Sequence, residues 1–295
     1  MRTFVTGASG FIGSAVVPEL IAAGHQVLGL ARSDASAAAL AAAGAQVLRG
    51  DLNDLPGLRS GARQSEGVIH LGFIHDFANL EASIRTDIRA IEAMGEVLAG
   101  SNRPFVFASG ALGVSPGNLA TEEMPFNAAA HPRAANAVEA LKLKDRGVRI
   151  SAVRLAPTVH GPGDHGFVKV LVDVARQRGA AGYIGDGTSR WNAVHRLDAA
   201  RLFRLALEKA PAGAIFHGVA DESVTQRTIA ELIGEKLGVP VVSIPPQAAG
   251  EHFGWLARFL AMDQAASSAL TQQRLGWKPT HPGLIEDLEL GHYFA

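Results

Sequence analysis

Along the first 160 positions, short continuous apolar runs alternate with segments in which apolar residues recur at helical spacing. Short apolar runs, such as residues 4–5 and 27–31, predict buried strands, and after each run the apolar residues recur every three or four positions, which predicts a helix. Regular alternation of strands and helices predicts a parallel sheet covered by helices on both faces. Further strands are expected at 46–48, 68–71, 105–108 and 150–154, and helices at 11–23, 35–43, 84–98 and 134–144.

One residue conflicts with this pattern. Pro18 lies inside the helix predicted at 11–23. Proline has no amide N–H, and its ring crowds the preceding turn of a helix. We keep the helix and expect a bend or a missing hydrogen bond at this position.

The regular alternation of predicted strands and helices ends after residue 154. Glycine and proline mark loops at 161–163 and 185–187, and helical periodicity returns near 167–177, 197–207, 226–237 and 282–290. The aromatic stretch at 252–256 either lines a cleft or packs one lobe on another, and we favour packing. The sequence thus predicts an α/β protein: a doubly wound parallel sheet in 1–160, with a return to it near 190–218, and a smaller C-terminal substrate-binding lobe within 161–295.

Composition narrows the possible functions. The chain has 295 residues, of which 47% are hydrophobic, and its 27 basic and 28 acidic side chains leave a net charge of -1, so nothing favours nucleic acid or an anionic membrane as a partner. The absence of cysteine excludes disulfides, zinc sites with thiolate ligands and cysteine nucleophiles. The N-terminal residues reach glycine too soon for a signal peptide or a membrane span, so we expect a cytoplasmic protein.

Three glycines follow the first predicted strand. Gly7, Gly10 and Gly13 lie where the chain turns from strand to helix, and in such turns glycine permits a sharp bend and close approach to a pyrophosphate. The helix N-terminus then offers free N–H groups and a favourable dipole to the anion. A structural turn alone is the alternative. The residues expected to contact a dinucleotide here are Gly7, Ser9, Gly10, Phe11, Ile12 and Gly13.

The run Thr6-Gly7-Ala8-Ser9-Gly10-Phe11-Ile12-Gly13 resembles the extended or atypical short-chain dehydrogenases/reductases, the NAD(P)-dependent epimerase/dehydratase-like group. The resemblance covers most of the chain. It implies an adenine contact at Gly50-Asp51-Leu52, although Asp51 also fits a helix cap or a loop carboxylate. Further cofactor contacts implied by the resemblance are Leu71 and Gly72 beside the ribose, and Pro157 and Val159 beside the nicotinamide.

The end of the second strand bears on cofactor choice. An acidic residue there binds the ribose hydroxyls of NAD, whereas an arginine pairs with the 2′-phosphate of NADP. Arg32 occupies this position, and Ser33 adds a hydroxyl. We therefore expect NADP (NADPH) rather than NAD. The alternative is that Arg32 is a solvated surface charge and Asp34 binds the ribose.

The chain departs from the family at the catalytic pair Tyr-x-x-x-Lys. His131 is the residue near this position that titrates around neutrality, and Ala135 stands where the lysine is expected. His131 is a candidate proton donor or a helix cap, and Tyr183, a ribose hydroxyl relay or ordered water are the other candidate donors. Ser109 matches the serine that binds the substrate carbonyl, with a local turn bond as the alternative.

Four residues are candidates for substrate contact. Arg190 and Trp191 follow a Gly-x-Gly loop that resembles the one in extended members, and His195 begins the element after it; a surface arginine and a core tryptophan are the alternatives. Phe73 follows the turn after the fourth strand. Histidines 70, 75, 160 and 165 lack the spacing and carboxylates of a metal site, so no metal is expected.

These observations predict NADPH-dependent reduction of a carbonyl on a small, apolar substrate, with Ser109 polarising the oxygen. One alternative is a nucleotide-sugar epimerase or dehydratase, which relies on the missing tyrosine. Another is a non-catalytic NADP-sensing protein, because function resides in the site and not in the scaffold. The oligomeric state stays open, with a homodimer allowed.

Overall fold

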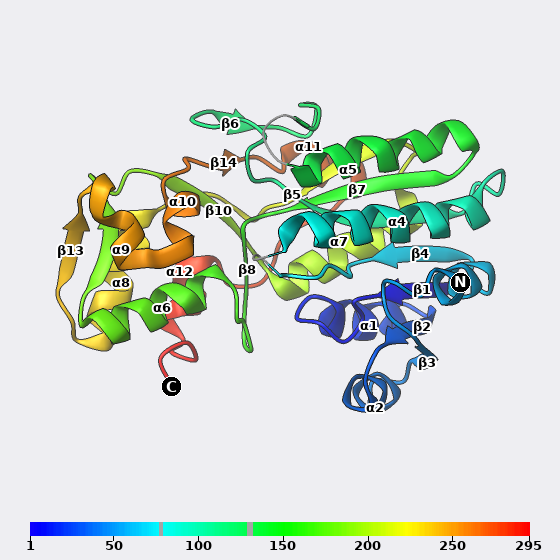
Figure 1. The fold of residues 1–295 in the computed structure, drawn as a ribbon, viewed down its shortest axis with the longest axis horizontal. Coiled ribbons are helices and arrows are strands. Elements are labelled where there is room, and N and C mark those ends of the chain that lie inside the picture. The colour runs from blue at the N-terminus through cyan, green and yellow to red at the C-terminus, as the bar shows by residue number, and fades with distance from the viewer. Residues whose placement is uncertain (77–78, 129–131) are drawn as a thin grey trace.

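The computed structural model of the protein describes residues 1–76, 79–128 and 132–295. Its main element is a seven-stranded sheet in which every neighbouring pair of strands runs parallel (Figure 1). The predicted doubly wound parallel sheet is confirmed. The strand order is β11 (Ala214–Gly218), β7 (Arg149–Leu155), β5 (Pro104–Gly110), β4 (Gly67–His70), β1 (Arg2–Thr6), β2 (Gln26–Ala31) and β3 (Gln46–Arg49).

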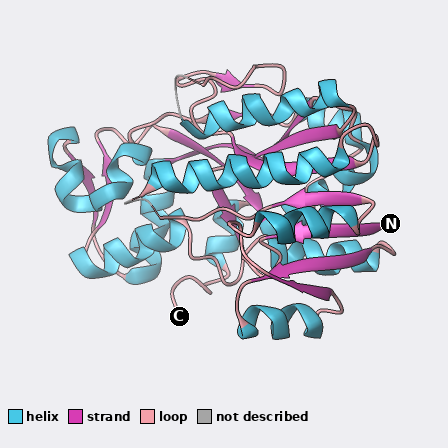
Figure 2. Cartoon of the chain, turned by 45° about the vertical axis from the view of Figure 1, so that its right-hand side comes forward, coloured by secondary structure: helices cyan, strands magenta, loops and turns pink. Residues whose placement is uncertain are grey.

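Helices cover both faces of this sheet (Figure 2). The strands are apolar on both sides for this reason: Phe4 packs into the cluster formed with α3, α4 and α5, and its neighbour Val5 packs into the cluster formed with α1 and α7. The helices are α1 (Gly13–Ala22), α2 (Asp34–Ala42), α3 (Leu55–Arg63), α4 (Leu80–Leu98), α5 (Pro132–Leu141), α7 (Arg196–Lys209) and α11 (Ala269–Leu275).

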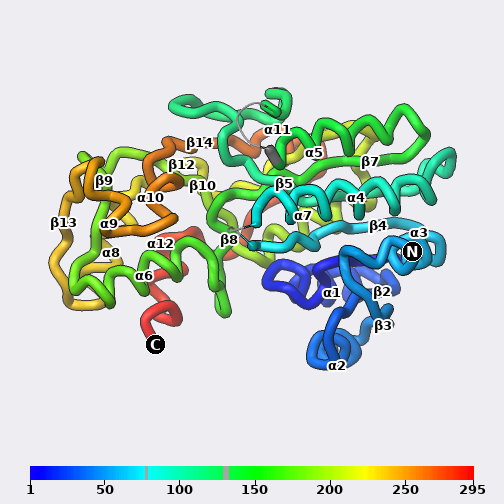
Figure 3. Tube along the Cα trace, viewed as in Figure 1, coloured from blue at the N-terminus to red at the C-terminus, as the bar shows by residue number. Residues whose placement is uncertain are grey.

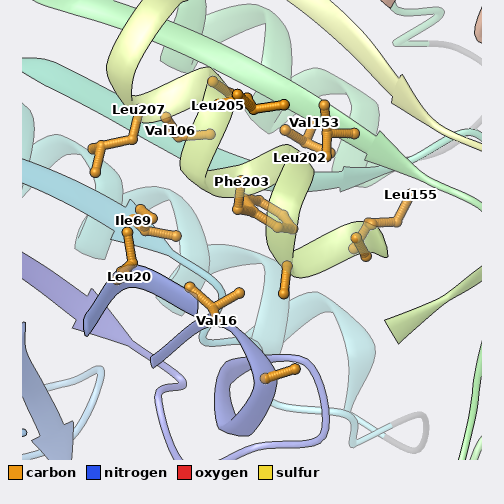
Figure 4. Close-up of a cluster of buried hydrophobic side chains, with 14 of the residues drawn as sticks. Val16, Leu20, Ile69, Val106, Val153, Leu155, Leu202, Phe203, Leu205 and Leu207 are labelled. Atoms are coloured by element: carbon orange, nitrogen blue, oxygen red, sulfur yellow. The ribbon is translucent and has the colours of Figure 1, made fainter. Parts of the chain in front are cut away.

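The layer between α1, α7 and the strands fixes the position of the glycine turn. Figure 4 shows Val16 and Leu20 of α1 and Phe203 of α7 directed toward strand residues. All three side chains are fully buried, and burial of a side chain of this size contributes about 1.5–3 kcal/mol. Pro18 lies on the exposed side of α1, and the helix continues through it as predicted.

The C-terminal elements form a third hydrophobic cluster beyond the carboxyl ends of the main strands. The helices predicted at 167–177 and 226–237 are present as α6 and α8. None of the helices in the described part of the chain is long and apolar enough to cross a bilayer. The strands are β6 (Leu119–Ala120), β8 (Thr158–His160), β9 (Ala181–Ile184), β10 (Arg190–His195), β12 (Asp221–Thr225), β13 (Val241–Ile244) and β14 (Ala265–Ala266), and the helices are α6 (Phe167–Arg178), α8 (Gln226–Leu237), α9 (Ala249–Phe253), α10 (Ala257–Leu260) and α12 (Leu284–Glu289), with short 3₁₀ turns at Lys142–Arg146, Pro246–Ala248 and Gly254–Leu256.

Candidate functional site

The turn between β1 and α1 is closed to side chains at two positions. Gly7 has a φ of 65°, and a Cβ on it would lie 2.7 Å from the amide nitrogen of Gly72. A Cβ on Gly13 would lie 2.1 Å from the carbonyl oxygen of Gly7. These glycines therefore let α1 pack onto the turn, and let the turn contact the segment after β4.

The first turn of α1 has backbone amide groups without an acceptor among the described residues. Within the described residues, no acceptor takes the N–H of Phe11, Ile12 or Gly13, and no side chain caps the helix. Ser9 and Gly10 are exposed at the same turn. Free donors at the positive end of a helix favour an anion, so this turn fits the pyrophosphate of a dinucleotide. The turn lies where the chain order reverses across the sheet, between β1 and β4.

Two arginines lie at the ends of the neighbouring strands β2 and β3. Arg32 is exposed directly after β2, and Arg49 ends β3 opposite Ala31. The Arg49 guanidinium donates to the carbonyl oxygen of Ser33 at 2.6 Å and to Oδ1 of Asp34 at 2.7 Å. The Ser33 hydroxyl accepts from the amide of Ser36 and so caps α2. Sequence reasoning missed Arg49, for which the only signal was its place at the end of a parallel strand.

The segment after β3 forms one wall beside the glycine turn. Oδ1 of Asp51 accepts from the amide of Asn53 at 2.7 Å, while Asp54 caps α3. The Leu52 side chain lies 3.0 Å from the position of a Cβ on Gly72. The structure therefore brings Leu52 and Gly72 to the turn at Gly7, with half-buried Leu71 adjacent.

A buried polar network runs from β1 to α5. Oγ1 of Thr6 lies 2.7 Å from Nδ1 of His70, and Nε2 of His70 lies 3.3 Å from Oδ1 of Asp87 on α4. Asn136 donates to Oδ2 of the same carboxylate at 3.2 Å, and Arg133 lies 3.9 Å from it. Burial acts to raise the pKa of Asp87, but its hydrogen bond with His70 and the charge of Arg133 hold that pKa below the ordinary value. None of these links was predicted from the sequence.

Ser109 lies near the carboxyl end of β5 and is 7% exposed. It shares a sheet face with Phe105 and Phe107, the face that α4 and α5 cover. A small recess begins at the next residue. Its lining is mostly apolar and consists of Gly110, Leu112, Gly113, Val114, Phe126, Asn127 and Ala134. We call it the β5 recess.

Phe73 joins this region. The guanidinium of Arg133 lies over its ring, with 4.0 Å between Cζ and the ring centroid, and also donates to the carbonyl oxygen of Ala108 at 3.3 Å. Phe73 is therefore close to the strand end that carries Ser109. His131, the candidate proton donor, lies outside the described residues.

Three other candidate residues lie among the C-terminal elements. Tyr183 is on β9, in the outer part of these elements (Figure 3), where its ring packs against Arg227. Trp191 is fully buried, and its Nε1 donates to the carbonyl oxygen of Phe259. Arg190 forms an ion pair with Asp263. The structure does not bring these three side chains to Ser109.

Strand β8 places Val159 opposite Val194, the residue before His195. Pro157 is half-buried, and Val159 pairs with Val194 in the register of β8 and β10. His195 caps α7 by accepting from the amide of Leu197 at 3.3 Å. Burial lowers the pKa of His195 to about 4, so this imidazole is neutral at pH 7.

Comparisons with known proteins agree with this architecture. The profile of the NAD dependent epimerase/dehydratase family matches residues 3–217. An uncharacterised protein of Schizosaccharomyces pombe is 50% identical over 295 residues and covers 100% of both chains. The 4-hydroxy-2-methyl-3-oxo-4-farnesyl-3,4-dihydroquinoline-1-oxide ketoreductase of Stigmatella aurantiaca is 27% identical over 288 residues, which are 92% of this chain and 84% of the relative.

A solved structure shows the same fold. The UDP-glucose 4-epimerase of Thermus thermophilus, in complex with NAD, superposes with a TM-score of 0.76 at 22% identity and with 99% of each chain covered. The family match spans the glycine turn, β5 with Ser109, and β11 at the edge of the main sheet. This chain belongs to the NAD-dependent epimerase/dehydratase family.

Proposed function

We propose that this protein is an oxidoreductase that uses NADP(H) to reduce a carbonyl group on a small, apolar substrate. The position of Ser109 near the carboxyl end of β5, directly before Gly110 of the β5 recess, carries the proposal. A hydroxyl at the edge of an apolar recess is suited to orient a carbonyl whose other groups are apolar. The similarity to a relative named as a ketoreductase supports reduction.

The residues of the chain have simple roles in this reaction. The turn from Gly7 to Gly13 would hold the pyrophosphate of NADPH, which when bound would supply the hydride that reduces the carbonyl carbon. The hydroxyl of Ser109 donates a hydrogen bond to the carbonyl oxygen and draws electron density from the carbon. The oxygen takes a proton from solvent, so that a ketone, NADPH and a proton give an alcohol and NADP⁺.

A panel of aldehydes, ketones and quinones tests the reaction by loss of nicotinamide absorbance. Turnover of apolar carbonyls supports a reductase. Absence of turnover together with NADPH binding would favour an NADP-sensing protein. Conversion of a nucleotide sugar without net oxidation of the cofactor would favour an epimerase.

The choice of NADP over NAD rests on Arg32, with Arg49 as a second cation at the same strand ends. Asp34 is paired with Arg49, which leaves this carboxylate less suited to the ribose of NAD. We predict that Arg32→Ala weakens NADPH binding about 10- to 100-fold, since it removes a charge-assisted phosphate contact. NADH binding should change little. Calorimetry with both cofactors measures the difference, and Arg63→Ala on α3 is the matched control. Equal weakening of both cofactors would contradict the assignment.

A further inference from the structure

We propose that Arg133 is the cationic catalytic residue of this site and stabilises the negative charge that develops on the substrate oxygen. This inference rests on the proposed carbonyl reduction. It assigns a role to a side chain that lies two positions from Ala135, where the family pattern has its lysine.

Arg133 contacts the strand end that carries Ser109, and its chain neighbour lines the β5 recess. Its guanidinium donates to the carbonyl oxygen of Ala108, the residue before Ser109. Its chain neighbour Ala134 lines the recess together with Gly110, the residue after Ser109. The guanidinium therefore lies at the same strand end as the hydroxyl that is proposed to bind the carbonyl.

Three contacts hold the guanidinium in place. The ring of Phe73 lies beneath it, Asp87 lies 3.9 Å from its Nε, and the Ala108 carbonyl accepts from its terminal nitrogen. Asp87 is in turn fixed by His70 and Asn136. A cation held in this way needs no reorganisation when charge develops nearby, which is the basis of electrostatic catalysis.

Arg133 carries its charge beside the carboxylate of Asp87. Burial lowers the pKa of Arg133, and Asp87 opposes this shift, but a guanidinium stays protonated at neutral pH. The pKa of His75, on the loop after β4, is lowered by burial and also by the charge of Arg133.

The role is electrostatic and transfers no proton. As the carbonyl carbon gains a hydride, the π electrons of the C=O bond move to the oxygen. Arg133 and Ser109 donate hydrogen bonds to this oxygen, which then takes a proton from solvent. An arginine suits this task because its donors are planar and its charge is permanent.

A stable anion tests the role without turnover. Hexanoate carries a carboxylate on an apolar chain, and with saturating NADP⁺ its oxygen can occupy the position of the charged substrate oxygen. Calorimetry should show hexanoate binding to the wild-type complex. We expect Arg133→Gln to weaken it about 10- to 100-fold, and Arg133→Lys, which keeps the charge, to restore part of the loss. NADP⁺ affinity should stay close to that of the wild type in both variants.

The matched control is Arg149→Gln. Arg149 is another partly buried arginine, which donates to the carbonyl oxygens of Leu207 and Ala210 at the amino end of β7. Its loss should lower the melting temperature without changing hexanoate affinity. If Arg133→Gln does not fold, Arg133→Lys carries the test, because it keeps the charge but loses the planar donor pair and should bind hexanoate several-fold more weakly.

The outcomes separate this inference from the proposed function. If the folded Arg133 variants bind hexanoate as well as the wild type, or if the wild-type complex does not bind it, the inference is overturned. If Arg133→Gln weakens hexanoate but the wild type reduces no carbonyl, the anion site stands and the proposed reaction fails. Where turnover is present, kcat for Arg133→Gln should fall about 10²- to 10³-fold with a smaller change in KM; an unchanged kcat would also overturn the inference.

Discussion

At the scale of single residues, Gly13 is the tightest point of the dinucleotide turn. A Cβ here meets the backbone oxygen of Gly7 at 2.1 Å, and a backbone atom cannot move aside as a flexible side chain does. Gly13→Ala should therefore push α1 away from the turn and lower the free energy of unfolding by about 1–3 kcal/mol. It should also weaken NADP binding, because the amides of the first helical turn shift.

Urea unfolding and calorimetry measure these two effects. Gly250→Ala on α9 is the control, because no atom lies within 4 Å of a Cβ at that position. If Gly13→Ala is as stable as the control and binds NADP normally, the close packing of α1 on the turn is not required.

The sequence indicated some residues of the site and missed others for a physical reason. Gly7 and Gly13 stand in one local turn, where spacing alone carries the signal. Arg133 reaches the carbonyl of Ala108 from 25 residues away, and Arg49 reaches Ser33 from 16 residues away. Such contacts depend on how the elements pack in three dimensions, and no local sequence pattern predicts them.

At the scale of elements, β1, β2, β4, β5 and β7 were predictable because each is a largely buried apolar run. The short strand β3 was also predicted although it is partly exposed, and β11 was not predicted as a strand. The helix α3 was not predictable, since it contains Pro56, Gly57 and Gly61. The structure explains one of these glycines: a Cβ on Gly61 would lie 2.6 Å from the ring of Phe4. Glycine at this position allows α3 to pack closely on β1. In the sequence alone the same glycine indicates a break in a helix, because glycine has a low helix propensity.

The C-terminal segment after α12 is tied to the loop after β8. The hydroxyl of Tyr293 donates to Oδ2 of Asp164 at 2.8 Å and accepts from the amide of Gly161 at 3.3 Å. Tyr293 is buried, and Asp164 lies in the same interface. Loss of the hydroxyl therefore leaves the buried amide of Gly161 and a partly buried oxygen of Asp164 unpaired.

We predict that Tyr293→Phe lowers the free energy of unfolding by about 1–3 kcal/mol, the cost of buried polar groups without partners. Chemical denaturation of the two tyrosine variants provides the comparison. Tyr183→Phe on β9 is the control and should change stability by less than about 0.5 kcal/mol. Equal stability of the two variants would show that the hydrogen bonds of the Tyr293 hydroxyl do not stabilise the position of the segment after α12.

At the scale of the whole molecule, two buried neutral histidines lie where the main sheet meets the C-terminal elements. His195 accepts through Nδ1 from the amide of Leu197, so this nitrogen carries no proton. His217 on β11 donates through Nδ1 to the carbonyl oxygen of Ser267 at 2.7 Å, and its Nε2 faces the guanidinium of Arg154 at 3.4 Å. Protonation would place a second cation beside Arg154 and would break the cap of α7.

Stability should therefore fall in mild acid. Burial lowers the pKa of both His195 and His217 to about 4, whereas an unfolded histidine has a pKa near 6.5. The unfolded state binds more protons below this value, so their contribution is complete above about pH 6.5 and is lost as the pH falls toward about 4, by roughly 2 kcal/mol for each histidine at about pH 5. Asp87, with its lowered pKa, acts only in stronger acid. Urea unfolding at about pH 7.5 and about pH 5 measures the loss, and His195→Gln should reduce it by about half. A free energy of unfolding that stays constant over this interval would show that the two histidines bind protons equally well in the folded and unfolded states, against the burial and hydrogen bonds that favour their neutral form in the folded protein.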